Sequence, residues 1–317
     1  MKIKLLLIFA FISESIFALS PLYSLKTKGN VTDMLYEEGQ LYISEDIGCI
    51  QVFKIPSKKN SENYYLPKIK DFTGKYIPAK IYSFDKIKGK KILIAVSQGK
   101  HGFSNVFIFN EGERNIVIED ISAKLIIKKV KFLNEEKVIF GLLSNEIILY
   151  DIKKKKEIYR KQISPYTFSD IVLNKEKNKA VTADESGIIH IIDVLSGKIS
   201  EELSGNNVDN VYQIDYKNNI ILCGGQDRRL SVYNMTNNSS YYIKSDFLIY
   251  GTGLSPSGKY AAYSCNEDND IQIINTITKT RINILKAHKS ILTKILFISE
   301  NEIFTGAEEN IVYFWKI

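Results

Sequence analysis

The sequence predicts an all-β protein, a β-propeller in which seven four-stranded antiparallel sheets form a ring. Three observations support this fold class. Isoleucine, valine, tyrosine and phenylalanine are frequent and alanine is scarce, a composition that favours strands over helices. Apolar runs alternate with a period of two and break after five or six residues, as strands do. One five-residue pattern recurs seven times along the 317 residues.

The recurring pattern is an aliphatic residue, any residue, an apolar residue, an anchor that is usually aromatic, and commonly Asn, Asp or Lys. IQVFK, IILYD and VYFWK are three of its copies. The seven anchors are Phe53, Phe109, Tyr150, Ile192, Tyr233, Ile274 and Trp315. Their separations are 56, 41, 42, 41, 41 and 41 residues. Five of the six intervals agree within one residue, which indicates tandem repeats.

Each repeat has room for four short strands. A small residue stands nine positions before most anchors, and turn-forming residues lie between the two, as in Ala183–Gly187. Alternating runs precede and follow this unit. About four strands in about forty residues is the size of a propeller blade. Paired-helix repeats are the competing interpretation, but they require helical periodicity over ten or more residues.

The two ends of the chain are predicted to complete one sheet. Only two residues follow Trp315, so the seventh blade lacks its fourth strand. Leu22–Lys26 is an alternating run that precedes the first complete blade and has no sheet of its own. We therefore expect this N-terminal strand to pair with the last blade and close the ring, which leaves only short, protected sheet edges.

Two motifs resemble the WD40 repeat family. Leu254–Tyr260 is similar to that family's Phe-Ser-Pro-Asp-Gly-Lys stretch, which joins the first two strands of a blade. Ala287–His288 with Phe314–Lys316 resembles the Gly-His and Trp-Asp pairs that bracket a repeat. The resemblance implies a seven-bladed WD40-like propeller. Because only one anchor is tryptophan and only His288 fills the histidine position, the family's hydrogen-bonded tetrad is expected to be mostly absent, leaving apolar packing to hold the blades.

Residues 1–18 have the features of a secretory signal peptide: two early lysines, an apolar stretch over Leu5–Ile12, and the small residue Ala18 at a plausible cleavage site. The alternative is a membrane anchor, but the apolar run is shorter than the ~20 residues of a spanning helix. No twin arginine precedes the run, and no cysteine follows it as in a lipoprotein. We expect one soluble propeller domain over residues 19–317, exported and without stable membrane insertion.

Charge and cysteine content give little sign of chemistry. The formal net charge of +7 comes mostly from lysines scattered over predicted turns, such as Lys153–Lys156, which argues against a nucleic-acid partner. Cys49, Cys223 and Cys265 have no CxxC spacing. Two interpretations stay open for them: a disulfide between Cys223 and Cys265, which occupy nearly equivalent places in neighbouring repeats, or small buried thiols.

No catalytic, cofactor-binding or metal-binding constellation is predicted. His101, His190 and His288 lie in different repeats without metal-ligand spacing, and His190 stands between two isoleucines, as a structural histidine would. Quinone-dependent dehydrogenases that use propellers are rich in tryptophan, and this chain has one. A lactonase-type propeller enzyme is the remaining enzymatic alternative, because its residues come from several blades. It would require a polar, metal-binding cluster in the central channel.

A protein-binding module is the favoured function, because propeller loops commonly carry partner contacts. The 56-residue interval has its extra residues in the connection over 56–78 and the turn over 97–105. Exposed aromatic and basic residues there, together with a double arginine in the fifth blade, are the candidate contacts. They are Lys70, Phe72, His101, Phe103, Arg228 and Arg229. Tolerated loop insertions are the alternative explanation of the longer interval.

Several stretches resemble the NapL family, the periplasmic WD40-type accessory proteins of nitrate reductase systems in epsilonproteobacteria. They are Leu66–Phe72, Leu143–Glu146, Asp209–Tyr212, Gly225–Arg229, Phe247–Tyr250 and Gly253–Pro256. The resemblance implies a periplasmic protein that supports nitrate reductase maturation or activity through protein contacts, without catalysis or a cofactor of its own. We expect it to be a monomer. A generic envelope assembly scaffold is the alternative non-enzymatic role.

Overall fold

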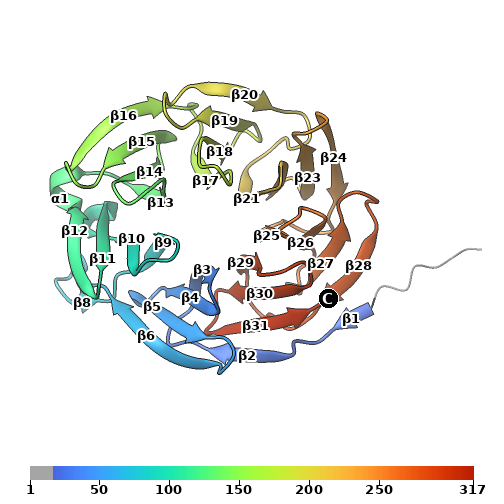
Figure 1. Cartoon of the computed structure of the whole chain (residues 1–317), viewed down its shortest axis with the longest axis horizontal. Coiled ribbons are helices and arrows are strands. Elements are labelled where there is room, and N and C mark those ends of the chain that lie inside the picture. The colour runs from blue at the N-terminus through green and yellow to red at the C-terminus, as the bar shows by residue number, and fades with distance from the viewer. Residues whose placement is uncertain (1–16) are drawn as a thin grey trace, which may run out of the picture.

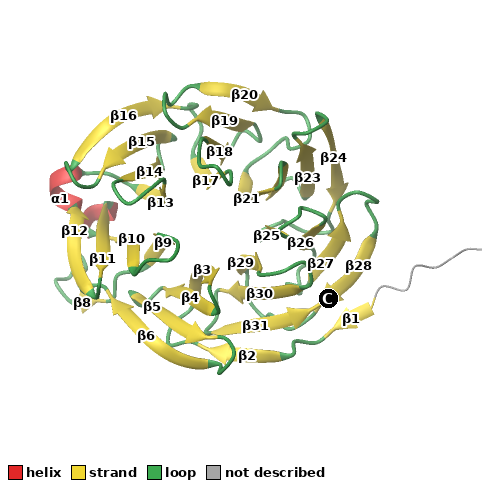
Figure 2. Cartoon of the chain, in the orientation of Figure 1, coloured by secondary structure: helices red, strands yellow, loops and turns green. Residues whose placement is uncertain are grey.

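Seven small sheets stand around a central channel in the computed structural model, which describes residues 17–317 (Figure 1). The predicted signal peptide therefore lies outside the described residues except for Phe17 and Ala18. Nearly all of the regular structure is β-strand, as Figure 2 shows, so the seven-bladed propeller prediction is confirmed and the paired-helix alternative is wrong. The fold is a WD40-like propeller with four antiparallel strands in each blade.

The strands run in chain order from the channel outwards in six blades, and the seventh takes its outer strand from the N-terminal segment. The inner strands are β3 (Val31–Glu37), β9 (Ile81–Lys86), β13 (Ile127–Phe132), β17 (Phe168–Leu173), β21 (Val211–Lys217), β25 (Thr252–Leu254) and β29 (Leu292–Phe297). The second strands are β4 (Gln40–Glu45), β10 (Ile92–Gln98), β14 (Lys137–Leu142), β18 (Lys179–Asp184), β22 (Ile220–Gly225), β26 (Tyr260–Ser264) and β30 (Glu302–Ala307). The third strands are β5 (Cys49–Lys54), β11 (Ser104–Asn110), β15 (Glu146–Asp151), β19 (Ile189–Asp193), β23 (Arg229–Asn234), β27 (Ile271–Asn275) and β31 (Ile311–Lys316). The outer strands are β6 (Lys59–Tyr65), β12 (Glu113–Ile118), β16 (Lys156–Gln162), β20 (Ile199–Leu203), β24 (Ser239–Lys244), β28 (Arg281–Leu285) and, for the seventh blade, β2 (Tyr23–Lys26).

The seven sequence anchors occupy one recurring position of the blade. Each lies on a third strand, is buried, and pairs with the second residue of the neighbouring second strand, as Phe53 does with Leu41 and Trp315 with Ile303. The small residues upstream of the anchors are explained by packing between blades. A Cβ on Gly141 would lie 2.3 Å from the ring of Phe168, and one on Gly224 would lie 2.3 Å from Ile249. A larger side chain there would push the next blade away.

The N-terminal strand closes the ring as predicted. β2 pairs antiparallel with β31, and Tyr23 stacks on Phe314 with the ring centroids 4.7 Å apart. Leu25 is buried in a cluster with residues of the first and seventh blades, including Leu41 and Val312. The seventh blade is thereby completed by the segment that leads directly into the first (Figure 1).

Five short elements lie outside this regular plan. β1 (Phe17–Leu19) pairs in parallel with β28 at the outer edge of the sixth blade. β7 (Ile69–Lys70) and β8 (Tyr76–Ile77) form a separate hairpin between the first two blades. The 3₁₀ turn η1 (Lys100–Gly102) and helix α1 (Asp120–Ala123) belong to the second blade and its connection to the third.

All three cysteines carry free thiols, so the disulfide interpretation for Cys223 and Cys265 is wrong. Cys223 is fully buried between the fourth and fifth blades. Burial raises the pKa of Cys49 to about 12 and that of Cys265 to about 11. None of the helical segments within residues 17–317 has the length and apolar character needed to cross a membrane.

Because the strands alternate in direction, the turns between second and third strands emerge on the same side of the ring as the connections between blades. We call this side the top face. It carries the β7–β8 hairpin, η1 and the turn that contains Arg228.

Candidate functional site

A recurring β-bulge shapes the mouth of the central channel on the top face. In six inner strands the pairing with the second strand skips one residue near the start, so that this residue has no partner. The side chain of a bulged residue points in a different direction from the one it would have in a regular strand. The six bulged residues are Thr32, Tyr82, Lys128, Ser169, Tyr212 and Thr293. All are half-buried, and five of them line a cavity at the channel mouth.

The residue after each bulge forms a second layer below the mouth, which we call the channel belt. It comprises Asp33, Ser83, Lys129, Asp170, Gln213 and Lys294. Its members connect different blades. Lys294 pairs with Asp33 at 3.4 Å and Lys129 with Asp170 at 3.3 Å. Gln213 accepts a hydrogen bond from the Thr252 N–H at 2.7 Å and donates one to the Thr293 carbonyl at 3.2 Å.

The charges of the channel belt are mutually satisfied. Burial alone would raise the pKa of Asp33, but Lys294, Lys129 and Lys131 outweigh it and hold that pKa below its usual value. Burial would likewise lower the pKa of Lys294, but Asp33, Asp170 and Asp215 reverse the effect and raise it to about 12. Both groups are therefore charged at neutral pH and stabilise each other. The belt is a structural layer, and two of its members, Lys129 and Gln213, line the cavity.

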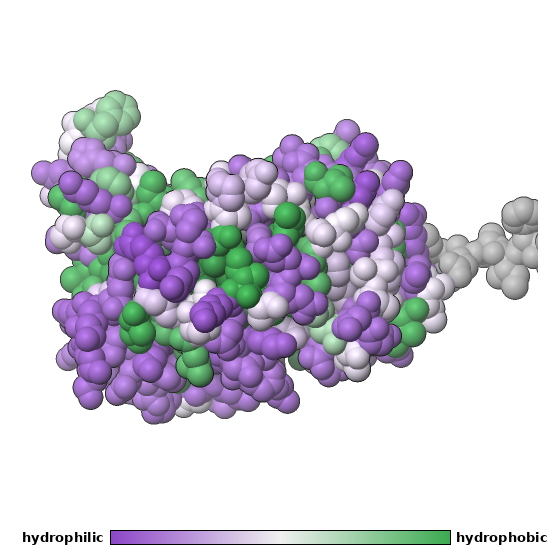
Figure 3. All heavy atoms as spheres, turned by 90° about the horizontal axis from the view of Figure 1, so that it is seen from above, coloured by the Kyte–Doolittle hydropathy of each residue, from purple (hydrophilic) through white to green (hydrophobic). Residues whose placement is uncertain are grey.

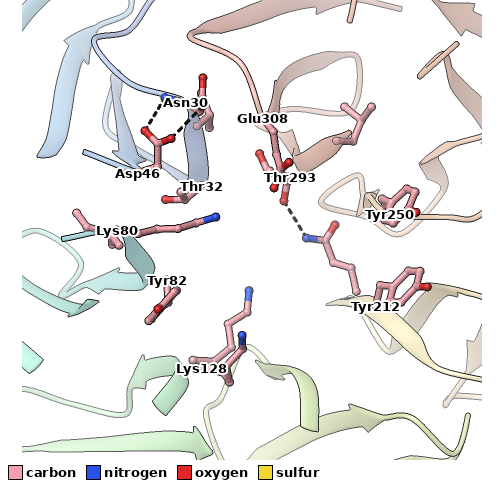
Figure 4. A pocket seen from close by; sticks show the side chains of 15 residues that line it. Asn30, Thr32, Asp46, Lys80, Tyr82, Lys128, Tyr212, Tyr250, Thr293 and Glu308 are labelled. Carbon is pink, nitrogen blue, oxygen red and sulfur yellow. Dashed lines mark hydrogen bonds between the residues drawn. The ribbon is translucent and has the colours of Figure 1, made fainter. Parts of the chain in front are cut away.

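The cavity above the belt has a volume of about 530 Å³, within the range of ligand-binding clefts. Figure 4 shows Lys80 and Lys128 pointing into it from the second and third blades. The Lys128 ammonium lies 5.4 Å from the ring centroid of Tyr82. Burial, followed by repulsion from Lys129 and Lys80, lowers the pKa of Lys128. This side of the mouth is therefore basic.

Acidic and aromatic groups line the rest of the mouth, with Asp46 next to Lys80 and the two tyrosines across the cavity from it (Figure 4). Asp46 is held by Asn30, whose backbone and side-chain N–H groups donate to its two oxygens at 2.9 and 3.0 Å. Glu308 is exposed at the rim. Tyr212 and Tyr250 stack with their centroids 5.3 Å apart (Figure 4), and the Tyr212 hydroxyl donates to Gln226 at 2.8 Å.

Two of the predicted partner-binding residues lie on the β7–β8 hairpin. Phe72 at its tip is completely exposed, with a relative accessibility of 102%. The tip is nevertheless well defined, because Asp71 accepts hydrogen bonds from the backbone N–H groups of Thr73 and Lys75 at 2.9 and 3.0 Å. The Lys70 ammonium lies 5.2 Å from the ring centroid of the exposed Tyr76. Figure 3 shows a segment projecting from the surface on the side where Figure 1 places β8.

His101 and Phe103 lie at the neighbouring turn of the second blade. His101 is exposed with a positive φ of 55°, whereas Phe103 is half-buried. The turn is fixed by the buried Asp120, which accepts hydrogen bonds from the Lys100 N–H at 2.7 Å and from the Asn105 side chain at 3.2 Å. The structure therefore places these two residues on the same face as the hairpin.

Arg228 and Arg229 lie across the ring, in the fifth blade, and are not brought together with the other four. Arg228 is exposed. The guanidinium of Arg229 is used within the protein, since it donates to the Asn206 carbonyl at 2.9 Å and covers the ring of Tyr242 at 4.5 Å. Its backbone N–H donates to Asp227 at 3.0 Å. Arg229 thus orders the turn that presents Arg228.

The sequence patterns did not single out Lys80, Tyr82 or Lys128. The last two are bulged residues at equivalent places in neighbouring repeats, 46 positions apart, so aligning the starts of the inner strands could have revealed them. No sequence pattern indicates that a bulge is present. A shift of one residue in the pairing register turns a side chain to the opposite face of the sheet.

Two of the three histidines, His190 and His288, are buried in structural surroundings. His288 forms a buried network with Thr305, Glu309 and Trp315, described below. His190 is buried, and its Nδ1 lies 3.8 Å from Asp184. Within residues 17–317, no three His, Cys, Asp or Glu side chains are grouped as metal ligands.

The fold and the top-face cavity define a WD40-like seven-bladed propeller with an open, mixed-charge channel mouth. Comparison with protein-family models finds no match for the chain, and comparison with curated proteins finds none either.

Proposed function

We propose that this protein is an exported, protein-binding propeller that acts as an accessory factor of a periplasmic nitrate reductase, in its maturation or its activity. The partner would bind to the top face, and the propeller would supply a surface without catalysis or a cofactor of its own. The localisation and the nitrate reductase link rest on the sequence resemblance described above. The binding mode rests on the geometry of the top face.

One observation carries the proposal. Of the six stretches that resemble the NapL family, five lie in connections between blades or in turns between second and third strands, and these emerge on the top face. Only Gly253–Pro256 extends to the opposite side. A resemblance confined to the blade cores would reflect the shared fold. Its concentration on one face favours a shared binding surface.

The β7–β8 hairpin supports a binding role. An aromatic ring that is fully exposed is unfavourable in water, yet Asp71 and Gly74, with a φ of +85°, hold Phe72 at the tip of an ordered turn. A pre-organised aromatic anchor loses little conformational entropy on binding. The hairpin is suited to insert Phe72 into an apolar recess of a partner.

The channel favours binding over catalysis of the lactonase type. Asp33 and Asp170 are paired with lysines, and each also accepts a hydrogen bond from the following backbone N–H, Met34 or Ile171, at 2.9 Å. Carboxylates engaged in this way serve the cohesion of the ring.

The proposal is tested by affinity capture of the tagged protein from periplasm, followed by mass spectrometry, together with nitrate reduction in a deletion strain. We expect a nitrate reductase subunit to be enriched and nitrate reduction to fall. Recovery of outer-membrane assembly proteins, with unchanged nitrate reduction, would support the envelope scaffold and refute the nitrate reductase role.

A further inference from the structure

Three lysines line the cavity, and two of them, Lys80 and Lys128, have no acidic partner within residues 17–317, whereas Lys129 has one. Within residues 17–317, neither ammonium group forms an ion pair or a hydrogen bond, whereas Lys129 and Lys294 of the channel belt are both paired with aspartates. Both unpaired lysines line the same cavity and point into it (Figure 4). Two neighbouring cations without a counterion create a positive potential at this side of the mouth.

The Lys128 side chain is positioned by the fold. The bulge in β13 leaves Lys128 out of the strand pairing, while the residue before it in that pairing, Ile127, is fully buried. The Tyr82 ring lies beside its ammonium group. Lys80 lies in the connection from the first to the second blade, where its carbonyl accepts a hydrogen bond from the Gln98 N–H at 2.8 Å. Two separate blades therefore hold the two lysines at one cavity.

We propose that the basic side of the channel mouth binds a carboxylate side chain of an acidic peptide segment, with Lys80 and Lys128 as its two cationic contacts. The ligand class follows from charge complementarity, since a carboxylate between the two ammonium groups would form charge-assisted hydrogen bonds and remove their repulsion. This inference rests on the proposed function, because the segment would belong to the partner that binds the top face.

A peptide fits the cavity better than a free inorganic anion does. The volume of about 530 Å³ exceeds that of a single small anion and leaves room for neighbouring residues of the same segment. The stacked Tyr212 and Tyr250 offer aromatic surface to apolar groups. Asp46, next to Lys80, and Glu308, at the rim, would repel a compact, multiply charged anion but could accept hydrogen bonds from peptide N–H groups.

The test uses the purified protein and a fluorescein-labelled hexaglutamate peptide, with binding measured by fluorescence polarisation at low ionic strength. We expect saturable binding that weakens as salt is added. The double variant Lys80→Gln/Lys128→Gln should bind at least about tenfold more weakly, as expected for the loss of two charge-assisted contacts. Its thermal midpoint should not fall, because the substitution removes a repulsion.

Matched controls separate a specific site from general charge attraction. Lys289→Gln removes an exposed lysine from another connection of the same face, outside the cavity, and should leave hexaglutamate binding unchanged. A hexaserine peptide should not bind. The inference is refuted if hexaglutamate shows no saturable binding, if Lys289→Gln weakens binding as much as the double variant, or if inorganic phosphate at equal ionic strength displaces the peptide.

The outcomes also separate this inference from the proposed function. If a partner is captured equally by the unchanged protein and by the double variant, the carboxylate site is wrong and the accessory role stands. If hexaglutamate binds through the two lysines but no nitrate reductase subunit is captured, the nitrate reductase role fails and the peptide site stands.

Discussion

Glu45 is a buried carboxylate at the point where the N-terminal strand crosses into the first blade. It is fully buried, and its Oε2 accepts a hydrogen bond from the Gly29 N–H at 2.7 Å. Its Oε1 has no partner within residues 17–317. Burial raises the pKa of Glu45 to about 7, and the opposing effects of Gly29 and Lys28 are too small to prevent this. Ionisation of this group therefore opposes folding.

The stability of the protein should consequently fall as pH rises. In the unfolded chain the carboxyl titrates near its ordinary value of 4.5, whereas in the folded protein it titrates near 7. The contribution of Glu45 to the free energy of unfolding is therefore largest below pH 4.5. It decreases by roughly 3 kcal/mol as the pH rises from 4.5 to 7. Urea unfolding at pH 5 and pH 8 should show this loss, and Glu45→Gln should abolish most of it. The exposed Glu267→Gln is the control, and an equal pH slope in both variants would contradict the assignment.

A second residue-scale feature is the buried network of the seventh blade. The Trp315 indole donates to Thr305 Oγ1 at 2.8 Å, and Thr305 Oγ1 lies 2.6 Å from His288 Nε2. His288 Nδ1 lies 2.6 Å from Glu309. The threonine oxygen accepts a hydrogen bond from Trp315, so its hydroxyl is free to donate one to Nε2. The Nδ1–H group of His288 then donates a hydrogen bond to Glu309. One hydroxyl thus satisfies two buried groups.

Thr305→Val should therefore destabilise the protein by about 2–5 kcal/mol, since it leaves both the indole N–H and the imidazole Nε2 without a partner. Thr182 provides a matched control at the equivalent place of the fourth blade: it is also buried, but its Oγ1 has no hydrogen-bond partner in the described part of the chain. Thr182→Val should change stability by less than about 1 kcal/mol. Denaturant midpoints measure the stability of both variants. Similar losses of stability would show that the hydrogen bonds of Thr305 contribute little.

At the scale of the element, the β7–β8 hairpin separates binding from stability. Phe72→Ala should leave the thermal midpoint unchanged, because a fully exposed ring contributes no burial to the folded state. If Phe72 is an anchor, partner capture should fall by at least about tenfold, the loss of a typical hot spot. The exposed Leu195→Ala, in the turn between β19 and β20 on the opposite face, is the control. Equal capture by all three proteins would remove the hairpin from the interface.

The strands could be predicted from the sequence more completely than the site. Anchor spacing identifies the third strands because Phe53, Trp315 and their counterparts meet the same packing environment in each blade. Alternation then places the neighbouring strands. The channel mouth depends on bulges, on which of Lys128 and Lys129 is paired with an aspartate, and on the meeting of Lys80 with a residue of the next blade. These are tertiary outcomes that no local pattern encodes.

The same limit applies to the predicted contact residues. Exposure of Phe72 and Arg228 could be inferred from turn chemistry, and the structure places both in turns. The contacts of Arg229 within the protein could not be inferred from the sequence, because they depend on the carbonyl of Asn206 and the ring of Tyr242 lying close to it. Adjacent residues of one type can thus have different roles.

At the scale of the whole molecule, each blade of the closed ring is stabilised by contacts with its two neighbours. The channel belt connects adjacent blades through Lys294–Asp33 and Lys129–Asp170, and β2 connects the first blade to the last. A blade in such a ring cannot move away without exposing the apolar faces that pack between it and its neighbours. We therefore expect the wild-type protein to unfold in one cooperative transition.

The single tryptophan makes this expectation measurable, because Trp315 reports on the seventh blade while far-UV circular dichroism reports on all seven. In the wild-type protein the urea midpoints of the two signals should coincide. Leu25→Asp places a charge in the apolar cluster that anchors β2 and should open the ring, so that the fluorescence midpoint falls below the circular-dichroism midpoint. Ser24→Asp changes the neighbouring, exposed position and should preserve coincidence. If Leu25→Asp lowers both midpoints equally, cooperativity comes from the packing between blades and does not need the closing strand.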